Sequence, residues 1–299
     1  MSLIGTLTSG VSALRSFTKG LEVIGNNIAN VNTTGFKAST VSFAESFSNT
    51  LRGSSASNGG GSNTSSMQIG TGVRLAQINA RHTQGALTST GVPTDLGVSG
   101  NGFFRVRNPL DGAEYVTRAG DFRIDDQGYL VTSHGYRVQG ATGDVANGVS
   151  TTVGDIRLSA AGTVPTGADP TATRVSFSID RQGFLVESFS DGTSAASNRV
   201  LLQNFTDPTG LQRFGENLYI GMDAAGPVGG LALDASATSD NLPGGGGLGS
   251  IESGVLELSN VDLTEEFANM IATQRSFQAG SRIVTVADSI LEEIVNLKR

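Results

Sequence analysis

The residues that could support chemistry are few and scattered along the chain. The two histidines, His82 and His134, have no metal-ligand spacing around them, and the chain contains no cysteine. The lack of cysteine removes thiolate catalysis, disulfides and cysteine-ligated zinc. Asp125 and Asp126 are adjacent carboxylates. They lie in a predicted turn, where aspartate is common, so their presence does not require a role in acid–base catalysis. The GNG stretch at residues 100–102 lacks the rest of any phosphate-binding motif. The sequence therefore predicts no enzyme, no cofactor and no metal site.

Composition points away from nucleic acid and from membranes. The 299 residues carry a formal net charge of −7, and lysine occurs only at Lys19, Lys37 and Lys298. Such a balance argues against a nucleic-acid-binding face. No stretch approaches the ~20 apolar residues of a membrane span. Residues 1–30 have no basic head followed by an apolar block, so we expect no ordinary cleaved signal peptide.

Both ends of the chain repeat apolar residues every seven positions, and the middle does not. A seven-residue repeat places one stripe on one side of a helix and favours pairing of helices. The stripe residues are Leu7, Leu14, Phe17, Leu21, Ile24 and Ile28 near the N-terminus, and Leu263, Phe267, Met270, Phe277, Val284 and Leu291 near the C-terminus. We predict that the two helices pair with each other as a coiled coil or with other copies. The alternative is that each helix packs on its own domain.

The outer faces of the N-terminal helix are small and nearly uncharged. The first 30 residues carry only Arg15, Lys19 and Glu22, with the remainder mostly Ser, Thr, Gly, Asn and Ala. Each glycine in a helix costs about 1 kcal/mol relative to alanine. The hypothesis is that the termini fold only when many copies assemble.

An asparagine-rich motif, NNIANVNTTGFK at residues 26–37, follows the first helical pattern. It contains Asn26, Asn27, Asn30, Asn32, Thr34, Gly35 and Phe36. Glycine permits a left-handed helix stop, and the phenylalanine offers an apolar anchor. The amides, which both donate and accept hydrogen bonds without charge, are predicted to bond across subunits of an assembly.

Between the ends the apolar period changes to two. Short strand patterns punctuated by Gly, Asn, Asp and Pro begin at Val73, as in an antiparallel β domain of hairpins. The predicted fold class is therefore modular α+β. Its predicted parts are a helical domain (1–34 plus 255–299), a Gly/Ser-rich connector (35–72), a β domain (73–240) and a return connector (241–254). Residues 122–131 and 177–186 echo each other, through either convergence of similar hairpins or duplication.

Several stretches resemble the bacterial flagellar axial proteins, the family of hook and rod subunits. The resemblance lies in NNIANVNTTGFKAS (26–39), QIGTGVRLAQINARHTQGALTSTGVPTDLGVSGNGFF (68–104), YVTRAGDFRIDDQGYLVTSHGYRVQG (115–140), LQNFTDPTGLQRFGENLY (202–219) and SNVDLTEEFANMIATQRSFQAGSRIVTVADSILEEIVNLKR (259–299). These stretches cover 136 of the 299 residues, in the family's order.

The resemblance implies a structural subunit of a hollow helical tube, with paired terminal helices inside and the β domain outside. It implies self-association, contact with neighbouring axial proteins such as the distal rod and the hook–filament junction, a hook cap during assembly, and passage through the flagellar export apparatus. The implied location is the extracellular hook or basal body.

Within the family the C-terminal sequence is more similar to the hook, which acts as a universal joint, and the hook is the first expectation. The length is nearer the distal rod, the drive shaft, which is the alternative. Residues 141–200 are the one possible remnant of the outer insert of longer hook proteins. A phage-tail or adhesin-type β fibre is a rival from another class, but it needs no paired terminal heptads.

Overall fold

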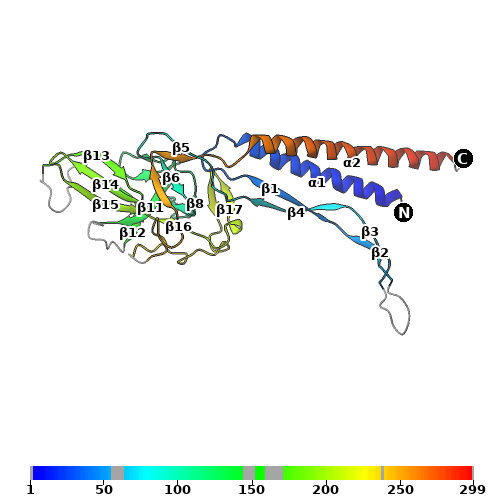
Figure 1. The fold of residues 1–299 in the computed structure, drawn as a ribbon, viewed down its shortest axis with the longest axis horizontal. Coiled ribbons are helices and arrows are strands. Elements are labelled where there is room, and N and C mark those ends of the chain that lie inside the picture. Colours follow the sequence, from blue (N-terminus) through cyan, green and yellow to red (C-terminus); the bar gives the residue numbers. More distant parts are fainter. Residues whose placement is uncertain (1–2, 55–63, 144–151, 159–170, 237–238, 298–299) are drawn as a thin grey trace, which may run out of the picture. The chain divides into compact units, whose positions relative to one another are not determined.

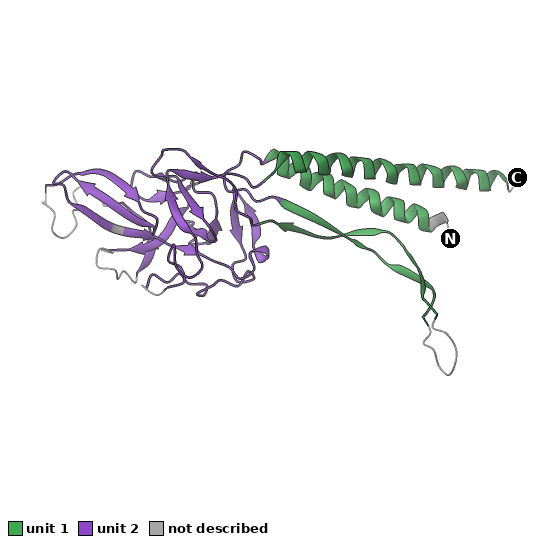
Figure 2. Ribbon diagram, viewed as in Figure 1, with its two compact units in different colours: residues 1–29, 39–81, 261–299 green, residues 30–38, 82–260 purple. Residues whose placement is uncertain are grey.

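The chain folds into two compact units, which Figure 2 distinguishes by colour. The computed structural model describes residues 3–54, 64–143, 152–158, 171–236 and 239–297. Unit 1 contains residues 1–29, 39–81 and 261–299, and unit 2 contains residues 30–38 and 82–260. The chain therefore passes between the units four times. The predicted α+β class, with terminal helices and a mainly antiparallel β region between them, is confirmed.

Unit 1 combines the two terminal helices with a long antiparallel ribbon (Figure 1). Its elements are α1 (Leu3–Ala29), β1 (Ser39–Glu45), β2 (Ser48–Arg52), β3 (Met67–Gly70), β4 (Val73–Ala80) and α2 (Leu263–Leu297). In the ribbon β1 pairs with β4, and β2 pairs with β3. The helices α1 and α2 run antiparallel and side by side, so both chain ends lie at the same end of the pair.

Helix α2 begins where its sequence provides a cap. The Asp262 side chain accepts hydrogen bonds from the backbone N–H groups of Thr264 at 2.8 Å and Glu265 at 3.3 Å. These bonds satisfy two of the free N–H groups of the first turn. Glu265 and Glu266 also lie in that turn, where the helix dipole favours negative charge.

Unit 2 is built from short strands. They are β5 (Leu87–Ser89), β6 (Leu96–Ser99), β7 (Phe103–Arg107), β8 (Glu114–Thr117), β9 (Arg123–Ile124), β10 (Leu130–Val131), β11 (Arg137–Thr142), β12 (Val153–Asp155), β13 (Arg174–Ile179), β14 (Phe184–Phe189), β15 (Ser194–Val200), β16 (Leu202–Gln203), β17 (Gln212–Gly215), β18 (Leu218–Ile220), β19 (Ser250–Ser253) and β20 (Val255–Glu257), with a 3-10 turn, η2 (Pro208–Gly210). The main sheet has the order β13-β14-β15-β11-β7-β8-β18-β17, and every pairing in it is antiparallel.

The core of unit 2 collects the inward-facing apolar side chains of this sheet. Phe104, Leu130, Leu185, Val200 and Ile251 are almost fully buried in one cluster. Burying each such side chain is worth about 1.5–3 kcal/mol relative to exposing it. This cluster holds the unit together from β6 through β19.

The element boundaries differ from those expected from sequence. The predicted connector of 35–72 contains strands β1, β2 and β3 of the unit 1 ribbon, and the central part of its Gly/Ser-rich stretch, residues 55–63, lies outside the described residues. The start of the predicted C-terminal helical segment forms strand β20, because residues Val255–Glu257 pair with β5. Within residues 141–200, strands β13, β14 and β15 continue the main sheet.

The echoed sequences form two hairpin turns with the same local structure. In the first, the Asp125 side chain accepts hydrogen bonds from the N–H groups of Gln127 at 3.0 Å and Tyr129 at 2.6 Å. In the second, the Asp180 side chain accepts from Gln182 at 3.0 Å and Phe184 at 2.8 Å.

An arginine from a later strand region closes each turn in the same way. Arg157 Nε donates to the Gln127 carbonyl at 2.9 Å, and Arg199 Nε donates to the Gln182 carbonyl at 2.8 Å. Arg157 lies over the Tyr129 ring, as Arg199 lies over the Phe184 ring. Because these arginines lie outside the echoed sequences, the structural repeat is longer than the sequence repeat.

The second turn requires glycine, and Gly183→Ala tests this requirement. Gly183 has a φ of +83°, and an added Cβ would lie 2.7 Å from the Val200 carbonyl oxygen. We expect Gly183→Ala to lower the free energy of unfolding by about 2–4 kcal/mol through strain and overpacking. Gly192→Ala is the matched control, since Gly192 has a φ of +82° but open space around it, and it should cost only about 1 kcal/mol. Equal losses in chemical denaturation would contradict the contact with Val200.

Candidate assembly surfaces

Glycines let the two helices of unit 1 approach closely. A Cβ added at Gly10 of α1 would lie 3.0 Å from the Val284 side chain, and one added at Gly280 of α2 would lie 3.4 Å from Leu14. At the other end of the pair, Asn27 Nδ2 donates a hydrogen bond to Glu266 at 2.9 Å. These contacts fix an antiparallel register in which Gly10 lies beside Val284 and Asn27 beside Glu266.

The structure divides the predicted stripe residues into two groups. Three of them, all on α2, are exposed: Leu263, Phe267 and Phe277. The others are half-buried: Leu7, Leu14, Phe17, Leu21, Ile24, Ile28, Met270, Val284 and Leu291. On α2 the positions of lowest exposure include Glu266, Gly280 and Ala287. Together with the half-buried Thr273 they repeat every seven residues, three positions after the apolar stripe. Small side chains thus occupy most of the second contact line of α2, a feature that a search for apolar residues overlooks.

Much of the remaining surface of α2 is apolar and exposed. The exposed large side chains are Leu263, Phe267, Ile271, Phe277, Ile283, Val286, Ile290, Ile294, Val295 and Leu297. Contiguous exposed apolar surface of this kind marks an interaction site. The helix is therefore a candidate for contact with other chains.

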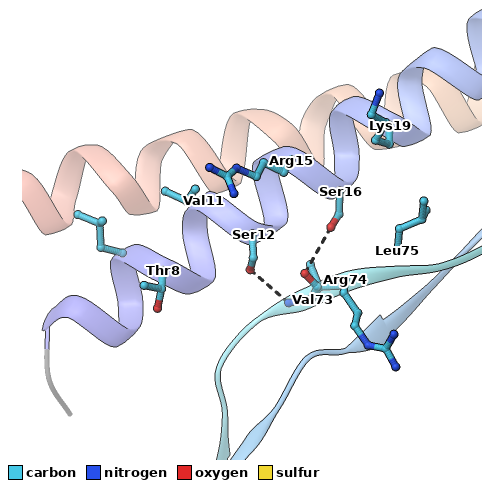
Figure 3. Close-up of a pocket in the computed structure, with 10 residues that line it drawn as sticks. Thr8, Val11, Ser12, Arg15, Ser16, Lys19, Val73, Arg74 and Leu75 are labelled. Carbon is cyan, nitrogen blue, oxygen red and sulfur yellow. Dashed lines mark hydrogen bonds between the residues drawn. The ribbon is translucent and has the colours of Figure 1, made fainter.

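A shallow groove of about 580 Å³ runs between α1 and β4 (Figure 3). It is lined by Leu7, Thr8, Val11, Ser12, Arg15, Ser16 and Lys19 of α1 and by Val73, Arg74 and Leu75 of β4. The Ser12 hydroxyl oxygen accepts a hydrogen bond from the Val73 N–H at 3.3 Å, and the Ser16 hydroxyl donates to the Val73 carbonyl at 3.4 Å. Two serines therefore tie the helix to the ribbon and form one wall of the groove.

A second groove of about 630 Å³ lies between the start of α1 and the β2–β3 part of the ribbon. Its α1 wall consists of the small residues Gly5, Thr6, Ser9, Gly10 and Ala13. No charged side chain lines it, and its polar lining consists of the neutral side chains of Thr6, Ser9, Asn49 and Thr71.

The first part of the asparagine-rich motif belongs to unit 1, where Asn27 is only 1% exposed. Its amide accepts a hydrogen bond from the Ser39 N–H at 2.9 Å and donates to the Ser39 carbonyl at 2.8 Å. A third bond goes to Glu266. For Asn27 the expectation of bonding across subunits is therefore wrong, because all three bonds are made within the chain. Burial raises the pKa of the Glu266 carboxyl, and the bond from Asn27 acts in the opposite direction.

The other motif asparagines take different positions. Asn26 and Asn32 are exposed, and Asn30 is half-buried. Asn30 accepts a hydrogen bond from the Thr33 hydroxyl at 3.1 Å in the turn that follows α1. This turn stops the helix before the chain continues through unit 2.

The end of the motif is held firmly inside unit 2. Gly35 adopts a left-handed φ of +67°, but α1 already ends at Ala29, so this glycine does not form the predicted helix stop. Its N–H donates to the Glu257 carbonyl at 2.8 Å. Asn217 donates to the Thr34 carbonyl at 2.9 Å. Phe36 is buried, and the Arg213 guanidinium lies 4.8 Å from its ring centroid. The predicted role of Phe36 as an apolar anchor agrees with this packing.

A buried ionic cluster lies next to this segment in unit 2. Lys37 Nζ contacts Glu257 Oε1 at 2.5 Å, and Arg118 contacts Glu257 Oε2 at 3.2 Å. The Lys37 side chain is 1% exposed, and that of Glu257 is fully buried. Burial lowers the pKa of Lys37, and the Glu257 carboxylate acts in the opposite direction. Sequence spacing gave no sign of this cluster, because its members lie far apart in the chain.

His82 packs beside the cluster. Its ring lies against the Phe103 and Tyr219 rings at centroid distances of 5.8 and 5.7 Å. Neither ring nitrogen has a hydrogen-bond partner among the described residues. Burial, helped by the nearby cations of Lys37 and Arg213, lowers the pKa of His82 to about 4.

Metal-ligating clusters and membrane-spanning helices are both absent from the described parts of the chain. Residues 3–54, 64–143, 152–158, 171–236 and 239–297 contain no cluster of three or more metal-ligating side chains. In the same ranges neither helix combines the length and apolar character needed to cross a membrane.

Three protein families match successive parts of the chain. Residues 7–37 match the family described as "Flagella basal body rod protein", residues 97–186 match "Flagellar hook protein FlgE/F/G D1 domain", and residues 252–297 match "Flagellar basal body rod FlgEFG protein C-terminal". The first match includes the whole asparagine-rich motif, and the last includes all of α2.

Whole-length relatives agree with these matches. The flagellar basal-body rod protein FlgG of Bacillus subtilis is 40% identical over 297 residues, which cover 99% of this chain and 100% of the relative. The FlgG protein of Caulobacter vibrioides is 30% identical with complete coverage of both chains. The flagellar hook protein FlgE of Borreliella burgdorferi is 25% identical over 453 aligned residues, covering 99% of this chain and 100% of the relative.

The buried amide of unit 1 is tested by Asn27→Leu. This change removes three hydrogen bonds and leaves Ser39 without its side-chain partner, so we expect a loss of about 2–3 kcal/mol in the free energy of unfolding. Amide exchange at Ser39 should accelerate in parallel. Asn32→Leu, at an exposed motif position, is the control and should change stability by less than about 0.5 kcal/mol. A stable Asn27→Leu variant with protected Ser39 would contradict the assignment.

The buried histidine of unit 2 predicts an acid-dependent loss of stability. The unfolded chain binds a proton at His82 near its ordinary pKa of 6.5, whereas the folded chain binds it only near pH 4. This contribution to stability is complete above pH 6.5 and declines between pH 6.5 and 4, by at most about 3 kcal/mol. In His82→Phe, which retains an aromatic ring, the denaturation midpoint should depend less on pH between pH 6.5 and 4 than it does in the wild type. The exposed His134→Phe should not, and an unchanged slope in His82→Phe would contradict the burial argument.

Proposed function

The chain belongs to the family of bacterial flagellar rod and hook proteins, and from this premise we propose that it is a subunit of the distal rod. It is a structural protein rather than an enzyme. The proposed rod is a hollow helical polymer that carries motor torque outward from the basal body.

Length and identity favour the rod over the hook. The rod relative from Bacillus subtilis aligns over 297 positions, nearly the 299 residues of this chain, at 40% identity. The hook relative needs 453 aligned positions at 25% identity, so it contains a large insertion that this chain lacks. The similarity of the C-terminal sequence to hook proteins, which made the hook the first expectation, is shared across the family match at residues 252–297. The hook therefore becomes the second candidate.

Unit 1 supports a role in polymerisation. Its helices present apolar side chains that the chain itself leaves uncovered, from Leu263 to Leu297 on α2. We propose that α1 and α2 pair as a coiled coil and that copies of this pair line the channel of the tube. Small residues such as Gly5, Ser9 and Ala13 along α1 suit close helix packing without a charged outer layer.

Unit 2 supports a role as a rigid outer body. Its core cluster and its two arginine-closed turns fix many short strands to one another. In the proposed assembly, contacts between copies of unit 2 limit sliding of neighbouring subunits. Neighbouring axial proteins and the flagellar export apparatus are the proposed partners, and export without a cleaved signal peptide is the proposed route.

Deletion of the gene, followed by electron microscopy of isolated basal bodies, tests this function. A distal-rod role predicts basal bodies that lack the distal part of the rod and therefore carry no hook, with both restored by the wild-type chain. Complete rods without hooks would instead support the hook role. Intact flagella in the deletion strain would overturn both proposals.

A further inference from the structure

The end of α2 is apolar, acidic and uncovered within unit 1. Leu291 is the last half-buried residue of the helix, and residues 292–297 are exposed all round. This end carries Asp288, Glu292 and Glu293 beside exposed Ile294 and Val295. No cation lies between 288 and 297, and Lys298 and Arg299 follow outside the described residues. A surface of this composition fits a partner with an apolar floor and a basic edge.

The groove between α1 and β4 has that character. Leu7, Val11 and Leu75 supply its apolar lining, and Arg15 and Lys19 lie further along the same wall (Figure 3). Arg15 forms no ion pair with any described residue, and Lys19 makes only an exposed pair with Glu22 at 2.6 Å. Exposed pairs of this kind are weak, so both cations remain available to another carboxylate.

The charges on the two surfaces have matching spacing. Arg15 and Lys19 are four residues apart, as are Asp288 and Glu292, and each spacing is about 6 Å along a helix. In an antiparallel alignment Lys19 faces Asp288, Arg15 faces Glu292, and Val11 faces Asn296, next to Val295. The apolar part of one surface then covers the apolar part of the other.

The same chain cannot provide this contact. Within unit 1, Gly10 lies beside Val284, so Arg15 lies opposite the region of residue 279. Glu292 is about thirteen residues further along α2, or about 20 Å. An α2 end that reaches this groove therefore belongs to a second copy.

We propose that the groove between α1 and β4 receives the C-terminal end of α2 from a neighbouring copy, in antiparallel alignment. This inference rests on the proposed function, because it specifies one subunit contact of the polymer. In this contact Arg15 and Lys19 set the register of the two helices, and Val11 makes apolar contact.

Charge exchange tests the pairing in the deletion strain. Arg15→Glu places a carboxylate against Glu292 and should reduce assembled rods and motility by about tenfold or more. Combining Arg15→Glu with Glu292→Arg should restore assembly, since every copy then carries both halves of the reversed pair. Combining Arg15→Glu with Glu293→Arg is the matched control and should not restore assembly, because residue 293 points about 100° away around the helix.

Crosslinking provides a second measurement that does not depend on rod formation in cells. Because the chain has no cysteine, Val11→Cys and Asn296→Cys can be placed on two differently tagged full-length chains. Oxidation of the mixed, concentrated chains should give a disulfide dimer that carries both tags. Pairing Val11→Cys with Ile271→Cys, an exposed position nearer the start of α2, is the control and should give little of it.

The outcomes separate the two proposals. Normal assembly of Arg15→Glu, or a mixed dimer no stronger than the control, would overturn the docking inference while leaving the rod function intact. Wild-type chains that fail to restore rods would overturn the function, and the crosslink would then decide the docking by itself.

Discussion

The organisation of unit 2 depends on the contacts that the buried carboxylate of Glu257 makes with other segments of the chain. One oxygen accepts hydrogen bonds from Lys37 at 2.5 Å and from the Gly85 N–H at 2.9 Å, and the other faces Arg118 at 3.2 Å. The backbone carbonyl of the same residue accepts from Gly35. Removing one partner of a buried ion pair costs about 3–5 kcal/mol, because the other charge is left without compensation. Segments that lie more than a hundred residues apart in sequence are therefore held at one point, close to where the chain passes into and out of the unit.

In both units, a buried or half-buried asparagine side chain also connects separate chain segments, in this case through hydrogen bonds to backbone groups. In unit 2, Asn260 accepts from the Ala38 N–H at 2.7 Å and donates to the Thr83 carbonyl at 3.1 Å, so it joins three segments beside the crossings at 38/39, 81/82 and 260/261. In unit 1, Asn27 joins Ser39 to α2 in a similar way. An amide suits this role because it donates and accepts at once and can be buried without a counter-ion.

The sequence predicts the parts of this architecture that follow a period. Seven-residue repeats predict both terminal helices, and glycine at residue 35 predicts the left-handed backbone found there, although α1 already ends at Ala29. The repeat does not reveal that Gly280 and Ala287 form the second contact line of α2, because helix contacts made by small residues carry no apolar signal. It favours Phe267 instead, which is half exposed. Strand β4 falls within the strand patterns that begin at Val73, whereas β1, β2 and β3 lie in the predicted connector and are missed. The ionic cluster cannot be inferred from spacing, because only the fold brings its members together.

Because the N-terminal helix has few charged side chains, each of them has a large influence on how the helix aligns with another helix. Burial of apolar surface between helices is not directional, so it favours association without choosing one alignment. Small side chains along α1 add close packing, but successive turns of such a helix resemble one another. Only three charged residues occur among the first 30, and two of them, Arg15 and Lys19, lie along the groove. Charge complementarity contributes more to register than to affinity. An assembly of nearly uniform helices therefore needs a few well-placed charges to fix how far one copy is displaced along the next, and in the proposed contact Arg15 and Lys19 at the edge of this groove have that role.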